Sequence, residues 1–200
     1  MSSKSFIFYY GIILQLFIVI CNSQNIPQNN QLKSSRVYQV IVNDVVFHKL
    51  GSYRGFTEEG SEYQKSYFFT RYSSSPWAEA RSFCNSYGFE FLSMDTLEEA
   101  RAVLTLADNH SFLRALQYTW LYVDGVALTI KSPTDWYWTK TGKKISYSIP
   151  WRVGTPNNDG GSEYCLTIGR YFTNEKFGFD DTLCDGRTRI TCQRIEFFIP

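Results

Sequence analysis

The sequence predicts an α+β domain, because two amphipathic helical segments lie early in the chain and short strand-like runs separated by turns follow them. The chain has 200 residues, which is long enough for one domain with a core of its own. Its 16 Phe, 14 Tyr and 5 Trp supply ample apolar surface for that core. The formal net charge is +1 and there is no long basic run, so nucleic acid is not an expected partner.

The first helix is expected to begin at Ser75-Pro76, where serine suits the N-cap and proline suits the first helical position. Apolar side chains then recur at helical spacing as far as Tyr87, and Gly88 is placed to end the helix. A second helix is expected to open with the capping-box pattern Thr96-Leu97-Glu98-Glu99. Its apolar stripe consists of Leu97, Ala100, Val103, Leu104 and Ala107.

Short strands are predicted on both sides of the two helices, from runs rich in aromatic and β-branched residues. These runs cover residues 67–69, 120–123, 136–139, 164–168 and 189–194. Trp136 and Trp138 alternate with Tyr137, which favours one buried and one exposed strand face over a sugar-stacking platform. Lys140, Lys143 and Lys144 surround Gly142 and indicate a solvated hairpin turn.

The N-terminal part of the chain, residues 1–61, is expected to lie outside the main domain. Residues 1–23 have the pattern of a secretory signal: Lys4 precedes an apolar run over 6–20, and small residues follow it. The chain is therefore expected to be secreted and extracellular. An uncleaved anchor is the alternative, but the run is shorter than the roughly 20 apolar residues that span a membrane, so stable membrane insertion is not expected.

Residues 24–61 are predicted to be an arm and linker that holds one strand. Residues 24–35 are polar and rich in Asn and Gln, which is typical of a flexible arm. The β-branched run 37–42 indicates a strand, and the turn-rich residues 51–60 suggest a linker or an addition to the domain.

Loss of the signal would remove Cys21 and leave an even set of four cysteines, Cys84, Cys165, Cys184 and Cys192. In an oxidising compartment such a set implies disulfides, although the sequence alone leaves three pairings open. A zinc site made by the four cysteines is the competing interpretation, and it lacks the C-x₂-C spacing that brings ligands together.

Oxygen-bearing side chains gather around a proline turn in the segment Gly154-Thr155-Pro156-Asn157, which is followed by Glu163-Tyr164-Cys165 and by Phe179-Asp180-Asp181-Thr182-Leu183-Cys184. Hard cations such as Ca²⁺ require several oxygen ligands of this kind. Together with the cysteines, these motifs resemble the C-type lectin-like domain family over residues 62–195, with 196–200 as a short tail. Further matches are Tyr67-Phe68-Phe69, Trp77-Ala78-Glu79-Ala80, Leu92-Ser93-Met94, Trp136-Tyr137-Trp138 and Trp151, with Trp120 to Gly125 as a loose match to the family's core motif.

The resemblance implies a C-type lectin-like fold with two helices, small antiparallel sheets, a long ligand-binding loop and two disulfides. It pairs Cys84 with Cys192 and Cys165 with Cys184, and it implies a cis peptide bond before Pro156. It further implies that sugar and Ca²⁺ share one set of side chains on the long loop, namely Thr155, Asn157, Glu163, Asp180 and Asp181.

Thr155 and Asp180 depart from the family pattern, which has Glu or Gln at the first position and Asn at the second. We therefore expect calcium binding to be weakened but not abolished, with Asp180 partly compensating for the uncharged Thr155. Asn157 favours mannose-type glycans, and the resemblance suggests recognition of microbial or cell-surface glycans in innate immunity. The alternative is a lectin-like domain that has lost sugar binding and recognises a protein, because Thr155 fits neither sugar rule.

Two further predictions concern modification and catalysis. Asn109-His110-Ser111 is an N-glycosylation sequon near the end of the second helix, and His110 is expected to be a surface residue. The sequence lacks the G-x-S-x-G and H-E-x-x-H motifs, and calcium ligation explains Glu163 and Asp181 better than glycoside hydrolysis does. The chain is therefore not expected to be an enzyme.

Overall fold

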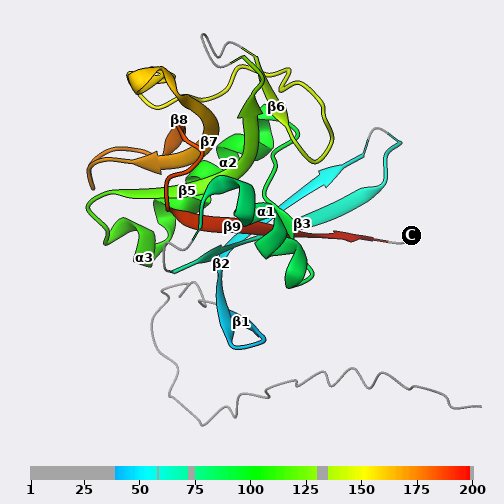
Figure 1. Ribbon diagram of the computed structural model, residues 1–200. Helices are drawn as coiled ribbons and strands as arrows, with labels where there is room; N and C mark the ends of the chain where they lie inside the picture. The colour runs from blue at the N-terminus through cyan, green and yellow to red at the C-terminus, as the bar shows by residue number, and fades with distance from the viewer. Residues whose placement is uncertain (1–38, 58, 72–74, 130–134, 199–200) are drawn as a thin grey trace, which may run out of the picture. The chain divides into compact units, whose positions relative to one another are not determined.

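A computed structural model describes residues 39–57, 59–71, 75–129 and 135–198 of the chain (Figure 1). The predicted signal at 1–23 and the arm at 24–35 lie outside the described residues. Within the described ranges, no helix is long and apolar enough to cross a membrane.

In the described part of the chain, nine strands join into one sheet in the order β1-β2-β3-β9-β5-β7-β8, with β4 added to β9 and β6 added to β5. The strands are β1 (Gln39–Val42), β2 (Val45–Phe56), β3 (Glu62–Thr70), β4 (Glu90–Phe91), β5 (Thr119–Ala127), β6 (Trp136–Trp138), β7 (Glu163–Arg170), β8 (Gly178–Leu183) and β9 (Arg189–Phe197). The helices are α1 (Trp77–Ser86), α2 (Leu97–Asn109) and α3 (Ser111–Arg114), with a 3₁₀ turn at Asp159–Gly161. Neighbouring strands are antiparallel except β5 and β9, which run parallel. The sequence thus predicted the α+β class correctly.

The segment 51–60, expected to be a linker or an addition to the domain, belongs to a long strand as far as Phe56. β2 runs from Val45 to Phe56 and pairs with β3 along most of its length. A Cβ atom at Gly51 would lie 2.5 Å from Leu106 Cδ2, so glycine stands there because α2 approaches the strand closely. Glycine content at 51–60 therefore marks close packing as well as turns. At the other end, Glu196 and Phe197, which were expected in a tail, belong to β9.

Both predicted helices are present, and the second begins as its capping pattern indicates. The Glu99 N–H donates to Thr96 Oγ1 at 3.1 Å. The Glu99 carboxylate, however, accepts from the N–H of Asp95 at 2.9 Å instead of returning to Thr96. α1 has Pro76 at its N-cap without a side-chain cap, so Ser75 does not have the capping role expected of it.

Two disulfides fasten the sheet, and they have the pairing that the family resemblance implied. Cys84–Cys192 ties α1 to β9, and Cys165–Cys184 ties β7 to the residue that follows β8. The zinc interpretation of the four cysteines is therefore wrong. The aromatic alternation in β6 is confirmed as a core pattern, because Trp136 and Trp138 are buried and Tyr137 is half-buried.

Candidate functional site

The ligand loop that precedes β7 is fastened at residues 150–152 to β8, a strand that the sequence did not predict. The Arg152 N–H donates to the Phe179 carbonyl at 2.8 Å, and the Phe179 N–H donates to the Pro150 carbonyl at 3.0 Å. β8 itself pairs with β7, so the loop is attached to the central sheet. Asp180 and Asp181 are therefore strand residues that lie beneath the loop, and they do not belong to a loop of their own.

Thr155 directly precedes Pro156 in the loop, and the peptide bond between them is cis. The Thr155 hydroxyl oxygen lies 3.0 Å from the carbonyl oxygens of both Arg152 and Phe179. A hydroxyl has one proton to donate, so Thr155 uses it for one of these two carbonyls at a time. Its side chain therefore serves the backbone of the loop and its supporting strand.

Asp181 holds the turn that follows the cis bond. Its side chain is buried, and its two carboxylate oxygens accept the N–H groups of Asn157 at 2.9 Å and Asn158 at 2.6 Å. Hydrogen bonds to a carboxylate are short and strong, so this pair fixes the direction of the turn. Asn158 adopts a positive φ of 45°, which asparagine tolerates better than most residues.

Glu163 closes the other end of the turn. Its N–H donates to Asn158 Oδ1 at 2.9 Å, and its Oε2 accepts the Asp159 N–H at 2.8 Å. Partial burial raises the pKa of Glu163, and the negative charges of Asp181, Asp180 and Asp159 add to that effect. The Asn157 side chain is exposed, and the Glu163 side chain is half-buried at the border of the loop.

Asp180 has a cation for a neighbour. Arg152 Nη2 lies 3.5 Å from Asp180 Oδ2, and both side chains are largely buried. The guanidinium carbon of Arg152 lies 4.2 Å from the ring centre of Tyr171 and 5.4 Å from that of Trp120, within cation–π distance of both. Burial raises the pKa of Asp180 to about 6, although Arg152 acts in the opposite direction.

The five predicted site residues thus lie together in space, but their oxygens do not form a complete calcium cage. Calcium takes 6–8 oxygen ligands. Asp180 pairs with Arg152, Thr155 bonds backbone carbonyls, and both Asp181 carboxylate oxygens accept backbone N–H groups. In the described ranges no three His, Cys, Asp or Glu side chains converge as a metal-binding group. Arg152 already supplies positive charge to one of the three carboxylates, and Asp181 is committed to the backbone of the turn, so the arrangement does not fit a tight calcium site.

Arg152 is the residue that the sequence analysis missed. It is the one basic residue between Lys144 and Arg170, and it lies three residues before Thr155. A single basic residue in a segment that also carries acidic residues could have indicated that Arg152 forms an ion pair. The sequence could not have shown that Asp180 is the other member of the pair.

His110 also differs from the prediction. It was expected at the surface, but its ring packs edge-on against Phe69 at 5.0 Å, and both ring nitrogens are buried without a hydrogen-bond partner in the described residues. The neighbouring Asn109 ends α2 and is exposed. Its glycosylation remains a prediction.

Residues 73–194 match the lectin C-type domain family, and we conclude that the chain belongs to that family. C-type lectin domains are in general carbohydrate-binding modules and not enzymes.

Solved structures of such domains are similar to this chain. The C-type lectin domain of murine dendritic cell inhibitory receptor 2, in complex with an N-glycan, has a TM-score of 0.51 at 17% identity, over 66% of this chain and 91% of that one. The lectin CEL-I from Cucumaria echinata has a TM-score of 0.49 at 20% identity, over 67% and 91%. The carbohydrate-recognition domain of the mouse scavenger receptor C-type lectin has 0.49 at 18%, over 73% and 95%. At these identities the likeness concerns the fold.

Proposed function

We propose that the chain is a secreted glycan-binding domain and that its sugar site lies on the turn from Asn157 to Glu163. The observation that carries this proposal is the clamp that Asp181 makes on the backbone of Asn157 and Asn158, directly after a cis peptide bond. The clamp preorganises the turn, so little conformational entropy is lost when a ligand binds.

The side chains at this turn suit sugar hydroxyls. The Asn157 amide can donate and accept hydrogen bonds, and the Glu163 carboxylate accepts them. Asn157 is the residue of mannose-type binders in the family, so we propose a mannose-type preference. By family resemblance, recognition of microbial or cell-surface glycans in innate immunity would be the biological setting.

We propose that calcium binds this turn weakly, with a dissociation constant above about 1 mM, the weak end for extracellular calcium modules. The reason is that Arg152 already neutralises Asp180, while the two oxygens of Asp181 accept backbone N–H groups of the turn. Contacts within the chain, from Arg152, Thr155 and Asp181, hold the loop on β8.

A glycan array tests the sugar proposal. The purified chain should bind mannose-type glycans, and Asn157→Ala and Glu163→Gln should each lower the signal at least tenfold. Glu98→Gln, which changes an exposed glutamate on α2, is the matched control and should bind like the unmodified chain. Binding that is absent, or unchanged in both loop variants, would refute the proposed sugar site.

Calorimetric titration tests the calcium proposal. The unmodified chain should give little heat below millimolar calcium. Thr155→Glu restores the acidic residue of the family triplet and should tighten calcium binding. Saturation of the unmodified chain at micromolar calcium would show that Arg152 does not displace the ion.

The second candidate function is recognition of a protein ligand. It is favoured by Thr155, whose hydroxyl bonds the carbonyls of Arg152 and Phe179 instead of facing a ligand. An array without any glycan signal, with and without chelator, would favour this candidate.

A further inference from the structure

A cavity lies away from the ligand loop, where the ends of β2, β3 and β9 meet the turn after β6. Its volume is about 520 Å³, and none of the residues from Thr155 to Glu163 lines it. Its apolar wall includes Phe56, Tyr63 and Phe197, and its polar lining includes Lys65, Asp95 and Lys143. The function proposed for the loop does not use this cavity.

Two exposed phenylalanines stand at the cavity. Phe56 is 71% exposed and Phe197 is 61% exposed, although large apolar side chains usually bury more of their surface. The Phe197 ring lies edge-on to Tyr63, with ring centres 6.4 Å apart. The cavity therefore offers aromatic surface to a ligand.

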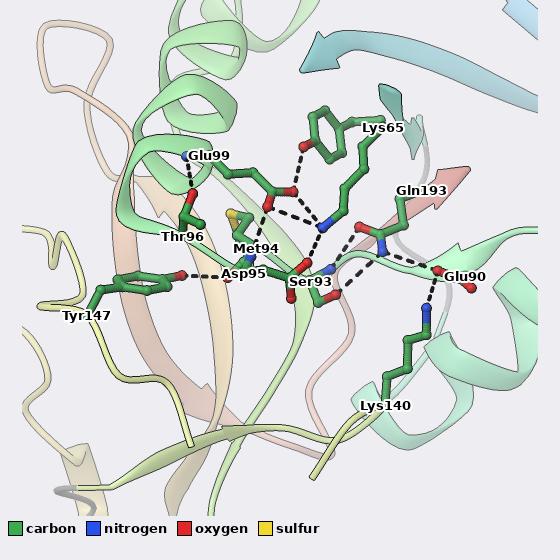
Figure 2. A network of polar contacts seen from close by, with 11 residues as sticks. Lys65, Glu90, Ser93, Met94, Asp95, Thr96, Glu99, Lys140, Tyr147 and Gln193 are labelled. Atoms are coloured by element: carbon green, nitrogen blue, oxygen red, sulfur yellow. Dashed lines mark hydrogen bonds and ion pairs between the residues drawn. The ribbon is translucent and has the colours of Figure 1, made fainter. Parts of the chain in front are cut away.

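One of the residues that line the cavity, Asp95, has a carboxylate held by a buried ion pair. Asp95 Oδ2 lies 2.5 Å from Lys65 Nζ, and the same ammonium lies 2.9 Å from Glu99 Oε1 (Figure 2). Lys65 is 2% exposed and Glu99 is fully buried, and Glu99 also accepts from Tyr67 at 2.7 Å. Asp95 is half exposed, and its Oδ1 has no hydrogen-bond partner among the described residues. The buried network thus holds one carboxylate oxygen in place at the cavity.

The charges around the cavity are nearly balanced. Lys65, Lys143 and Lys144 line it together with the carboxylates of Glu59 and Asp95. Two of these lysines pair with further carboxylates, Lys65 with Glu99 and Lys144 with Asp135 at 2.8 Å. Four carboxylates therefore accompany three lysines, and a polyanion would meet no excess of positive charge.

These features together define the ligand chemistry. A pyranose ring has an apolar face of C–H groups and an edge of hydroxyl donors. Sites for such small ligands combine apolar walls with a few placed polar groups. We propose that this cavity is a second, metal-independent sugar site that takes a neutral pyranoside, with its C–H face on Phe197 and its hydroxyls donating to Asp95.

The test is a titration of the full chain with small sugars in the presence of EDTA. Binding is detected by ligand-observed NMR. The probes are the methyl pyranosides of mannose, glucose, galactose and N-acetylglucosamine, with methyl glucuronide as the anionic comparison. At least one neutral pyranoside should bind, and Phe197→Ala and Asp95→Asn should each weaken it at least tenfold. Phe172→Ala removes a phenylalanine of similar exposure, 56%, outside the cavity lining and should leave binding unchanged.

A combined Asn157→Ala and Glu163→Gln variant separates the two sugar sites. This variant should still bind the neutral pyranoside in EDTA, because the cavity does not include the loop residues. The result is the same whether or not the loop binds sugar. Thermal melting of each variant shows that it is folded, and Phe197→Ala, at an exposed position, serves if Asp95→Asn is unstable. The proposal is overturned if no neutral pyranoside binds in EDTA, if the glucuronide binds more tightly, or if Phe172→Ala and Phe197→Ala weaken binding equally.

Discussion

At the scale of single residues, Arg152 and Asp180 join the ligand loop to the strand that supports it. The guanidinium of Arg152 lies over Tyr171 and beside Asp180, while its backbone N–H bonds β8. One residue thus joins the loop, the strand below it and an aromatic ring. Arg152 also supplies positive charge beside the acidic residues for which we propose weak calcium binding.

Arg152→Met should destabilise the chain by about 2–3 kcal/mol, because it leaves the buried Asp180 carboxylate without its partner. Adding Asp180→Asn should recover most of that loss, since no buried charge then remains. Urea denaturation at pH 7.5 measures both variants. A loss below about 0.5 kcal/mol in Arg152→Met, the range of an ordinary surface substitution, would contradict a structural role for the pair.

We expect the folded chain to lose stability in acid because of its two histidines, His48 and His110. Burial lowers the pKa of both His48 and His110 below 6.5, and the positive charge of Arg71 adds to this for His48. The unfolded chain therefore binds these protons more readily, so this stability is complete above pH 6.5 and is lost as the pH falls below it. Phe69 and Phe112 pack against these rings, and Arg71 and Arg189 lie over Phe112.

Other groups respond to acid in the opposite sense, because burial raises the pKa of Asp124, Glu163 and Asp180. The histidine effect is therefore measured as a difference. Between pH 7.5 and 5.0, the unmodified chain should lose more stability than His110→Phe in urea denaturation. Phe112→Leu is the control, since it alters the same cluster without removing a proton site. Parallel profiles for the unmodified chain and His110→Phe would refute the expected effect.

At the scale of elements, the contact between β5 and β7 supports the loop. Trp120 and Gly169 lie opposite each other on these strands. A Cβ atom at Gly169 would lie 2.0 Å from Trp120 Cε3 and 2.5 Å from the Thr119 carbonyl oxygen. Glycine is required at this position because the neighbouring strand approaches closely, and not because the chain turns there.

Gly169→Ala should therefore destabilise the chain by about 3 kcal/mol or more, because both the indole and the backbone would have to move. Gly186→Ala is the matched control: its added Cβ would meet Tyr122 Oη at 3.2 Å and should cost under about 1 kcal/mol. Equilibrium denaturation compares the two. Similar stabilities for both variants would show that the strands can separate without loss.

At the scale of the whole molecule, the disulfides contribute unequally. Cys84–Cys192 closes a separation of 108 residues and Cys165–Cys184 one of 19. In the chain-entropy account these are worth about 5 and about 3 kcal/mol. Replacing Cys84 and Cys192 with alanine should lower the melting temperature more than replacing Cys165 and Cys184. The reverse order in a thermal melt would show that loop length does not decide the ranking.

The second disulfide pair has a local consequence that the melt does not report. Cys165–Cys184 joins β7 to the end of β8, which carries Asp180 and Asp181. Loss of this bridge should therefore weaken glycan binding at the loop more than loss of Cys84–Cys192 does, when both variants are assayed well below their melting temperatures.

The sequence by itself determined the features that rest on short-range signals. Both main helices were predicted, and so was the Thr96–Glu99 cap, because helical spacing and capping chemistry involve residues three or four apart. The α+β class and the buried face of β6 were determined in the same way. The disulfide pairing followed only from the family resemblance.

The tertiary structure alone decided which distant side chains meet. Arg152 meets Asp180 across 28 residues, and Lys65 meets Glu99 across 34. β8 and most of β2 pair with the strands next to them in the sequence, yet neither has a clear strand pattern. β8 carries the buried Asp180 and Asp181, and β2 contains Gly51 at its close approach to α2, and only the tertiary packing explains these residues. The candidate loop residues were named from the sequence, but their roles depended on these contacts. A carboxylate can bind a metal or can stabilise the fold. Which of these it does depends on the cations and N–H groups that the fold brings to it.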